Sequence, residues 1–178
     1  MKPSKPSSPP IKCLSITFCR IDESMLRELI DALLNLKTLH SLQLSFTSAG
    51  SKGATYCAKL ITHSSLKNLV LSGNYFGDKG TQVLAAALPT CSLEHLNLSH
   101  NLITELGLHA IAKEVERHPT LKTINLSFNP FMSAPLFHAA LRSTQSLSEI
   151  PLNRTLSVEA AFKISQLSEQ KHFPRFLL

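Results

Sequence analysis

The chain has 178 residues, of which 43% are hydrophobic and 6% aromatic, with no tryptophan and a formal net charge of +6. This length suits one domain of ordinary size, and aliphatic side chains are numerous enough to fill a continuous core. The sequence contains no stretch of the roughly 20 consecutive apolar residues that a membrane-spanning helix needs, so we expect no membrane span.

Residues 1–10 contain four prolines together with serine and lysine. Such a segment cannot bury a core, and we expect a disordered or extended leader. It also lacks the apolar segment of a secretory signal peptide. We therefore expect a cytoplasmic protein. Its four cysteines are Cys13, Cys19, Cys57 and Cys91. Their spacing matches no zinc-binding pattern, and we expect all four thiols to be reduced.

One apolar pattern recurs six times over residues 11–168. Its clearest copies run from Leu66 to Asn74 and from Leu93 to Asn101. The central apolar residue returns every 26 to 28 residues, at Leu14, Leu42, Leu69, Leu96, Ile124 and Ile150. A period of this size is typical of a solenoid, in which each unit buries its apolar face against its neighbours.

Each unit reads as a strand, a loop and a helix. In the unit that begins at Leu66, Leu69 and Leu71 alternate with outward residues, and Val83 and Leu84 follow at helical spacing. We expect helices over 24–36, 51–63, 78–89, 105–117, 133–145 and 157–168. Candidate N-caps or first-turn polar residues are Ser24, Ser51, Asp78, Thr104 and Ser133. The helices should pack outside a parallel sheet.

Two columns of equivalent residues support this register. The ninth position of the units holds side chains that can hydrogen-bond to loop backbone, namely Cys19, Thr47, Asn74, Asn101, Asn129 and Thr155. An unpaired loop amide costs about 1–3 kcal/mol when buried, which explains why this column is restricted to such residues. The second column is Gly53, Gly80 and Gly107, where the absence of a Cβ lets the helix start lie close to the preceding loop.

The pattern Leu-x-x-Leu-x-Leu-x-x-Asn, followed by glycine and a full helix, resembles the leucine-rich repeat of the ribonuclease-inhibitor type over about residues 11–168. The resemblance implies an α/β horseshoe of about six units with a parallel sheet on its concave face. Members of that family are mostly protein-binding scaffolds, and some are effectors that intracellular bacteria inject into host cells. The resemblance therefore implies a non-enzymatic scaffold without a cofactor, in its specific form an effector acting in host cytosol.

Outward positions of the strands face the predicted concave surface, which is polar and mostly uncharged with phenylalanines along one rim. Because protein interfaces favour aromatic side chains over lysine and glutamate, we expect a protein partner to bind there. The candidate partner-binding residues are Phe46, His95, Asn97, His100 and Phe128. An alternative is that these phenylalanines pack against the loop beneath them.

Other functions have weaker support. No cysteine or carboxylate completes a metal site with His95 and His100, and Ser99 beside His100 lacks an orienting acid. The net charge leaves RNA binding open, but the repeats carry no basic stripe, and nucleic acid is the less favoured partner. A GTPase-activating role would need a rim arginine, for which Arg20 and Arg154 are the candidates.

The ends of the array need covers, since terminal units of a solenoid expose an apolar face. The first helix carries polar residues that suit a cap. Residues 169–178 form a tail that ends in apolar residues, and we expect this tail to fold over the open end. Exposure of the tail would instead allow self-association, so the expected state is a monomer or a weak end-to-end dimer.

Overall fold

The computed structural model describes residues 10–131, 146–153 and 175–177. It contains seven strands: β1 (Cys13–Thr17), β2 (Ser41–Ser45), β3 (Asn68–Val70), β4 (His95–Asn97), β5 (Thr123–Asn125), β6 (Glu149–Pro151) and β7 (Arg175–Leu177). Its helices are α1 (Glu23–Leu33), α2 (Gly50–His63), α3 (Gly77–Ala87) and α4 (Glu105–Val115), with a 3-10 turn η1 (Leu88–Thr90). The helices expected over 133–145 and 157–168 lie outside the described residues.

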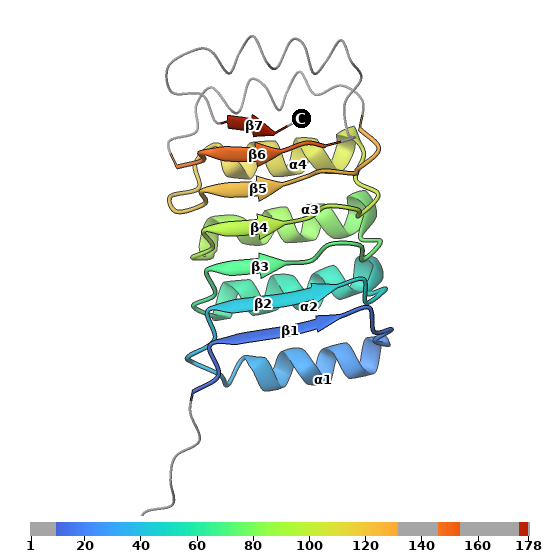
Figure 1. Cartoon of the computed structure of the whole chain (residues 1–178), viewed down its shortest axis with the longest axis vertical. Coiled ribbons are helices and arrows are strands. Elements are labelled where there is room, and N and C mark those ends of the chain that lie inside the picture. The colour runs from blue at the N-terminus through green and yellow to red at the C-terminus, as the bar shows by residue number, and fades with distance from the viewer. Residues whose placement is uncertain (1–9, 132–145, 154–174, 178) are drawn as a thin grey trace, which may run out of the picture.

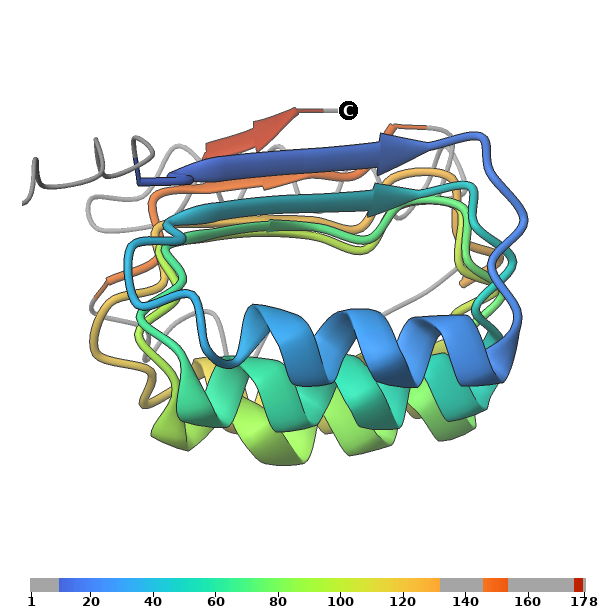
Figure 2. The ribbon, with the colours of Figure 1, turned by 90° about the horizontal axis from the view of Figure 1, so that it is seen from below.

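All seven strands lie parallel and in chain order in one sheet (Figure 1). The four helices form a second layer on one side of that sheet (Figure 2). The expected α/β solenoid is therefore confirmed. The other side of the sheet, which we call the concave face, carries the outward side chains of the strands.

The core lies between the two layers and is built from the repeated apolar positions. Leu42, Leu69 and Leu96 occupy equivalent positions in neighbouring strands and are 0–3% exposed. Leu14 pairs with Leu42 in register but is only half-buried, because it lies on the first strand. Burial of a leucine or isoleucine stabilises the fold by about 1.5–3 kcal/mol, so this spine supplies much of its stability.

Asparagines link consecutive loops as expected. The Asn101 side chain accepts hydrogen bonds from the backbone N–H groups of Asn74 and Phe76 at 3.0 and 3.4 Å, and donates to Leu71 and Ser99 carbonyls. Asn74 and Asn129 repeat this arrangement one unit before and after. Cys19 departs from this column, since its side chain is exposed rather than buried.

Helix starts are fixed by carboxylates and a hydroxyl. Asp22, rather than Ser24, is the N-cap of α1, and Thr104 is the N-cap of α4. Asp78 lies in the first turn of α3, yet its Oδ1 accepts from the N–H groups of Thr104 and Gly107 in the next unit, at 2.8 and 2.9 Å. One carboxylate therefore caps the following helix and fixes the spacing of two units.

The glycine column allows this close approach. A Cβ on Gly107 would lie 2.7 Å from Oδ1 of Asp78, and one on Gly80 would lie 3.0 Å from the Cβ of Ala54. These two contacts are to the preceding helix, and the expected approach to the preceding loop is seen at Ile103 and Phe76, whose side chains would lie 2.8 and 3.0 Å from the same two Cβ atoms.

The described part of the tail does not simply fold across the end of the array. Arg175, Phe176 and Leu177 form β7, which pairs with Glu149, Ile150 and Pro151 of β6. These three residues add one parallel strand to the sheet and pair with β6 along the edge that faces away from β5. A covering role for the rest of 169–178, and the boundaries at residues 10 and 168, stay predictions.

Candidate partner-binding surface

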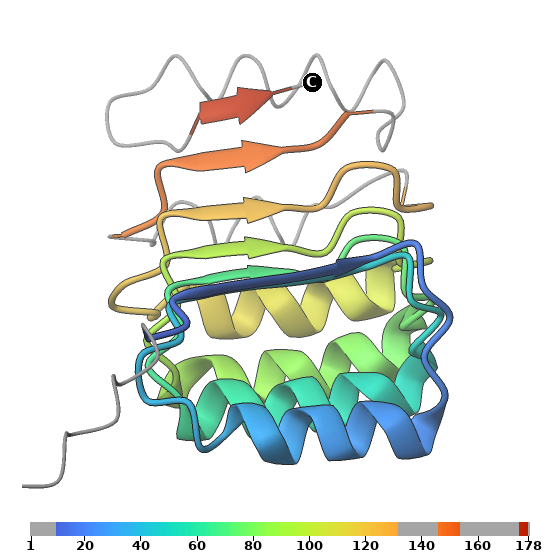
Figure 3. The same cartoon turned by 60° about the horizontal axis from the view of Figure 1, so that its bottom comes forward.

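The loops that follow the strands stack along one edge of the sheet (Figure 3). At one equivalent position of these loops the backbone has a positive φ of 55° to 69°, at Phe18, Phe46, Gly73, His100 and Phe128. Each of these residues donates its N–H to a carbonyl of the next unit, at 2.8–3.1 Å. The left-handed conformation costs non-glycine residues about 1–2 kcal/mol, and this inter-unit hydrogen bond stabilises it.

Four of these residues form what we call the aromatic row: Phe18, Phe46, His100 and Phe128. The Phe18 and Phe46 rings stack with centroids 4.8 Å apart, and those of His100 and Phe128 stack at 4.2 Å. The Phe46 and His100 rings lie 6.0 Å apart and are tilted by 51°. The row therefore extends from the unit of β1 to that of β5, with no ring contributed by the third unit.

The rings of this row are exposed. Phe18 is 79% exposed, and Phe46 and Phe128 are each 39% exposed, although side chains of this type are usually buried. Phe46 also lies against the loop of the next unit at Gly73, so packing against loop backbone and exposure of the ring edges occur together. The rings stack against one another and leave their outer edges to solvent.

Gly73 occupies the position in the third unit where the row has no ring. A Cβ there would lie 2.3 Å from an atom of the Phe46 ring, which leans over this glycine. The φ of +69° also suits glycine. Gly73 thus lets Phe46 lie across the third unit toward His100.

The two remaining candidate residues lie apart from the row, within β4. His95 Nδ1 is 2.8 Å from the hydroxyl of Thr123, and Asn97 Oδ1 accepts from the N–H and hydroxyl of Ser99. The ring contacts therefore join Phe46, His100 and Phe128 and do not include His95 or Asn97. Phe18 was missed as a candidate, although the repeat register places it in the same column.

Charge is absent from the concave side of β1 to β5. Three positions of each unit lie on this side, and in the short strands β3 to β5 the third position falls two residues after the strand ends. They are Cys13, Ser15, Thr17, Ser41, Gln43, Ser45, Asn68, Val70, Ser72, His95, Asn97, Ser99, Thr123, Asn125 and Ser127. Ion pairs lie elsewhere, on the helices and before the strands, as between Glu94 and both Lys67 and Lys122. The row therefore borders an uncharged, hydrogen-bonding surface.

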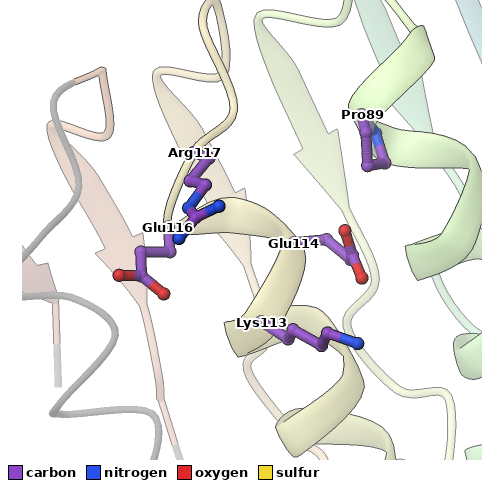
Figure 4. A pocket seen from close by; sticks show the side chains of 5 residues that line it. All are labelled: Pro89, Lys113, Glu114, Glu116 and Arg117. Carbon is purple, nitrogen blue, oxygen red and sulfur yellow. The ribbon is translucent and has the colours of Figure 1, made fainter.

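A pocket on the helix side has a different character (Figure 4). It is lined by Pro89 and by Lys113, Glu114, Glu116 and Arg117 around the end of α4. Both signs of charge surround it, and it contains none of the predicted site residues.

The described residues offer little for catalysis. They contain no group of three His, Cys, Asp or Glu side chains placed to hold a metal ion. All four cysteines are free, and burial raises the pKa of the Cys57 thiol to about 12, which leaves it unreactive. Arg20 is exposed, and Arg154 lies outside the described residues. No helix in the described ranges is long and apolar enough to cross a bilayer.

One buried polar pair belongs to the core. The pair is His118, which is 3% exposed, and Cys91, whose Sγ lies 3.5 Å from His118 Nε2. The other ring nitrogen, Nδ1, accepts hydrogen bonds from the backbone N–H groups of Thr120 and Leu121. Burial lowers the pKa of His118 from its ordinary value of 6.5 and raises that of Cys91. This pair joins two units and lies away from the aromatic row.

Comparisons with known proteins agree with the repeat architecture. Residues 91–112, which include β4 and most of α4, match a family model described as leucine-rich repeat. No curated protein matches the chain. Among solved structures, TLR13 in its complex with ssRNA13 is similar, with a TM-score of 0.53 and 20% sequence identity over 85% of this chain. The chain spans 20% of that protein's length. The fold is therefore that of an α/β leucine-rich repeat solenoid.

Proposed function

We propose that this protein is a non-enzymatic scaffold that binds a protein partner on its concave face, at the aromatic row. The observation that supports the proposal is the exposure of two stacked ring pairs, Phe18 with Phe46 and His100 with Phe128, beside an uncharged, hydrogen-bonding sheet. Solvent-exposed aromatic side chains of this kind are the residues most often found as anchors in protein interfaces.

The finer assignment rests on the repeat itself. A strand and a full helix in a period of 26 to 28 residues are typical of the ribonuclease-inhibitor type. An effector acting in host cytosol is the specific form of the proposal, supported by family resemblance alone.

The experiment combines crosslinking and mutagenesis. Crosslinking–mass spectrometry in native cytosol first identifies a partner, which is then titrated against the purified full chain. Replacing Phe46 and Phe128 with serine should weaken binding by at least about tenfold, since aromatic anchors dominate interface energetics. Val83→Ser is the matched control, because Val83 is also 39% exposed but lies on α3. Equal loss in the control would contradict the proposal.

RNA binding is the second candidate. Two observations favour it: the net charge of +6, and the similarity to TLR13, whose structure is a complex with ssRNA13. Aromatic rows can also stack bases. However, a phosphate backbone needs lysine or arginine contacts, and the concave side of β1 to β5 offers none. Binding of oligouridylate that falls steeply with added salt would support RNA, whereas negligible binding would remove it.

A further inference from the structure

The dimensions of the aromatic row restrict what can lie on it. It is one ring wide and crosses four inter-strand steps, from the unit of β1 to that of β5. The successive ring centroids are 4.8, 6.0 and 4.2 Å apart, which limits the row to about 15 Å from the first centroid to the last. A narrow, linear occupant matches this shape better than a globular surface.

The groups beside the row restrict the charge of that occupant. The concave-side groups nearest the row are hydroxyls and amides, of which Ser45, Ser72 and Ser99 are buried, while Gln43 and Asn97 are half-buried. Ser72 and Ser99 already bond to each other at 2.8 Å, whereas Gln43 reaches Ser45 only at 3.4 Å and keeps donor capacity. An uncharged segment that brings carbonyl acceptors is the complementary partner, and phosphate is not.

Three kinds of polypeptide could be considered. A strand could not be added here, because the backbone groups of β2 to β5 are already paired between strands. An amphipathic helix presents an apolar stripe at least about 100° wide and needs a groove of matching width. A row that is one ring wide is too narrow for that stripe. A polyproline II helix is narrow, presents apolar rings and free carbonyls, and docks on aromatic side chains.

We propose that the aromatic row binds a proline-rich segment in the polyproline II conformation. This inference rests on the proposed function and names the chemistry of its partner. At about 3.1 Å per residue, about five residues of such a segment cover the row. Its prolines pack on Phe18, Phe46 and Phe128, and its carbonyls accept from donors such as Gln43 and His100.

The test titrates decaproline into the isotopically labelled full chain and follows backbone amide signals by NMR. A glycine–serine peptide of equal length is the control ligand. We expect saturable shifts at residues 18, 46, 73, 100 and 128 with decaproline alone. Phe46→Ser with Phe128→Ser should weaken this binding by at least about tenfold, and Val83→Ser should leave it within about twofold.

Two glycine variants separate the shape of the row from backbone strain. Gly73→Ala and Gly77→Ala both place a side chain at positive φ, but only the first meets the Phe46 ring, since nothing lies within 4 Å of Gly77. Gly73→Ala should therefore weaken decaproline binding several-fold, and Gly77→Ala should not. The NMR spectrum of each variant without ligand verifies that it keeps the native fold.

Each other outcome overturns this inference. Decaproline that binds no better than the glycine–serine peptide, or binds equally to the serine variants, excludes a polyproline site. Row-dependent binding of oligouridylate in place of decaproline assigns the row to single-stranded RNA. If decaproline fails while the crosslinked protein partner still depends on Phe46 and Phe128, this inference falls and the proposed function stands.

Discussion

The loop asparagines show at the scale of single residues how this sequence specifies its fold. Asn101 makes four hydrogen bonds to the backbone of two units and is fully buried. Asn68 lies one unit earlier, on strand β3 rather than in a loop, and its buried Oδ1 has no partner among the described residues. The same residue type therefore has very different energetic roles at two positions.

Asn101→Ala should lower the free energy of unfolding by about 1–3 kcal/mol, because buried backbone groups lose their partners. Asn68→Ala is the matched control and should change it by less than about 1 kcal/mol. Urea denaturation measures both. Equal effects of the two substitutions would mean that the asparagine ladder does not stabilise the fold.

His118 gives a pH dependence at the same scale. Its pKa is lowered in the folded state because burial disfavours the imidazolium, so below pH 6.5 the unfolded chain binds more protons than the folded chain. Stability should thus be complete above pH 6.5 and fall as the pH decreases below it. Thermal melts at pH 7.5 and 5.5 measure this loss, which should be smaller in His118→Gln. An unchanged loss in that variant would assign it to other groups.

At the scale of elements, the sequence predicted β1 to β6 and the four described helices because the apolar period is strict, whereas β7, which lies beyond the last repeat, was expected as a covering tail. It did not predict that Asp78 would cap the following helix, because capping rules consider only the residues next to a helix start. Nor did it predict the stacking of Phe18 on Phe46, which depends on a shared left-handed conformation that spacing alone does not reveal.

Asp78→Ala should destabilise the start of α4. The substitution removes charge-assisted bonds to Thr104 and Gly107, which corresponds to about 1–2 kcal/mol for an N-terminal cap. Hydrogen exchange should accelerate in the first turn of α4 and leave α2 unaffected. Lys79→Ala, at the adjacent exposed position, should stay within about 0.5 kcal/mol of the parent chain. Matching exchange rates in the two variants would show that Asp78 does not cap α4.

At the scale of the whole molecule, a solenoid is stabilised by contacts between neighbouring units, and its ends open first. Leu14 and Ile16 of β1 are half-buried, whereas Leu42 and Leu44 of β2 are buried. Backbone amides of β2 to β4 should therefore exchange more slowly than those of β1. Uniform protection across the four strands would indicate global unfolding as one unit.

The central claim concerns which face of the solenoid holds the partner, and site-specific photo-crosslinking tests it most directly. Phe18 is replaced by p-benzoylphenylalanine in one full chain, and Val83 on α3 is replaced in a second. If the aromatic row is the binding site, the partner crosslinks from position 18 and not from position 83. Crosslinking of the same partner from position 83 alone would place the interface on the helices and contradict the account.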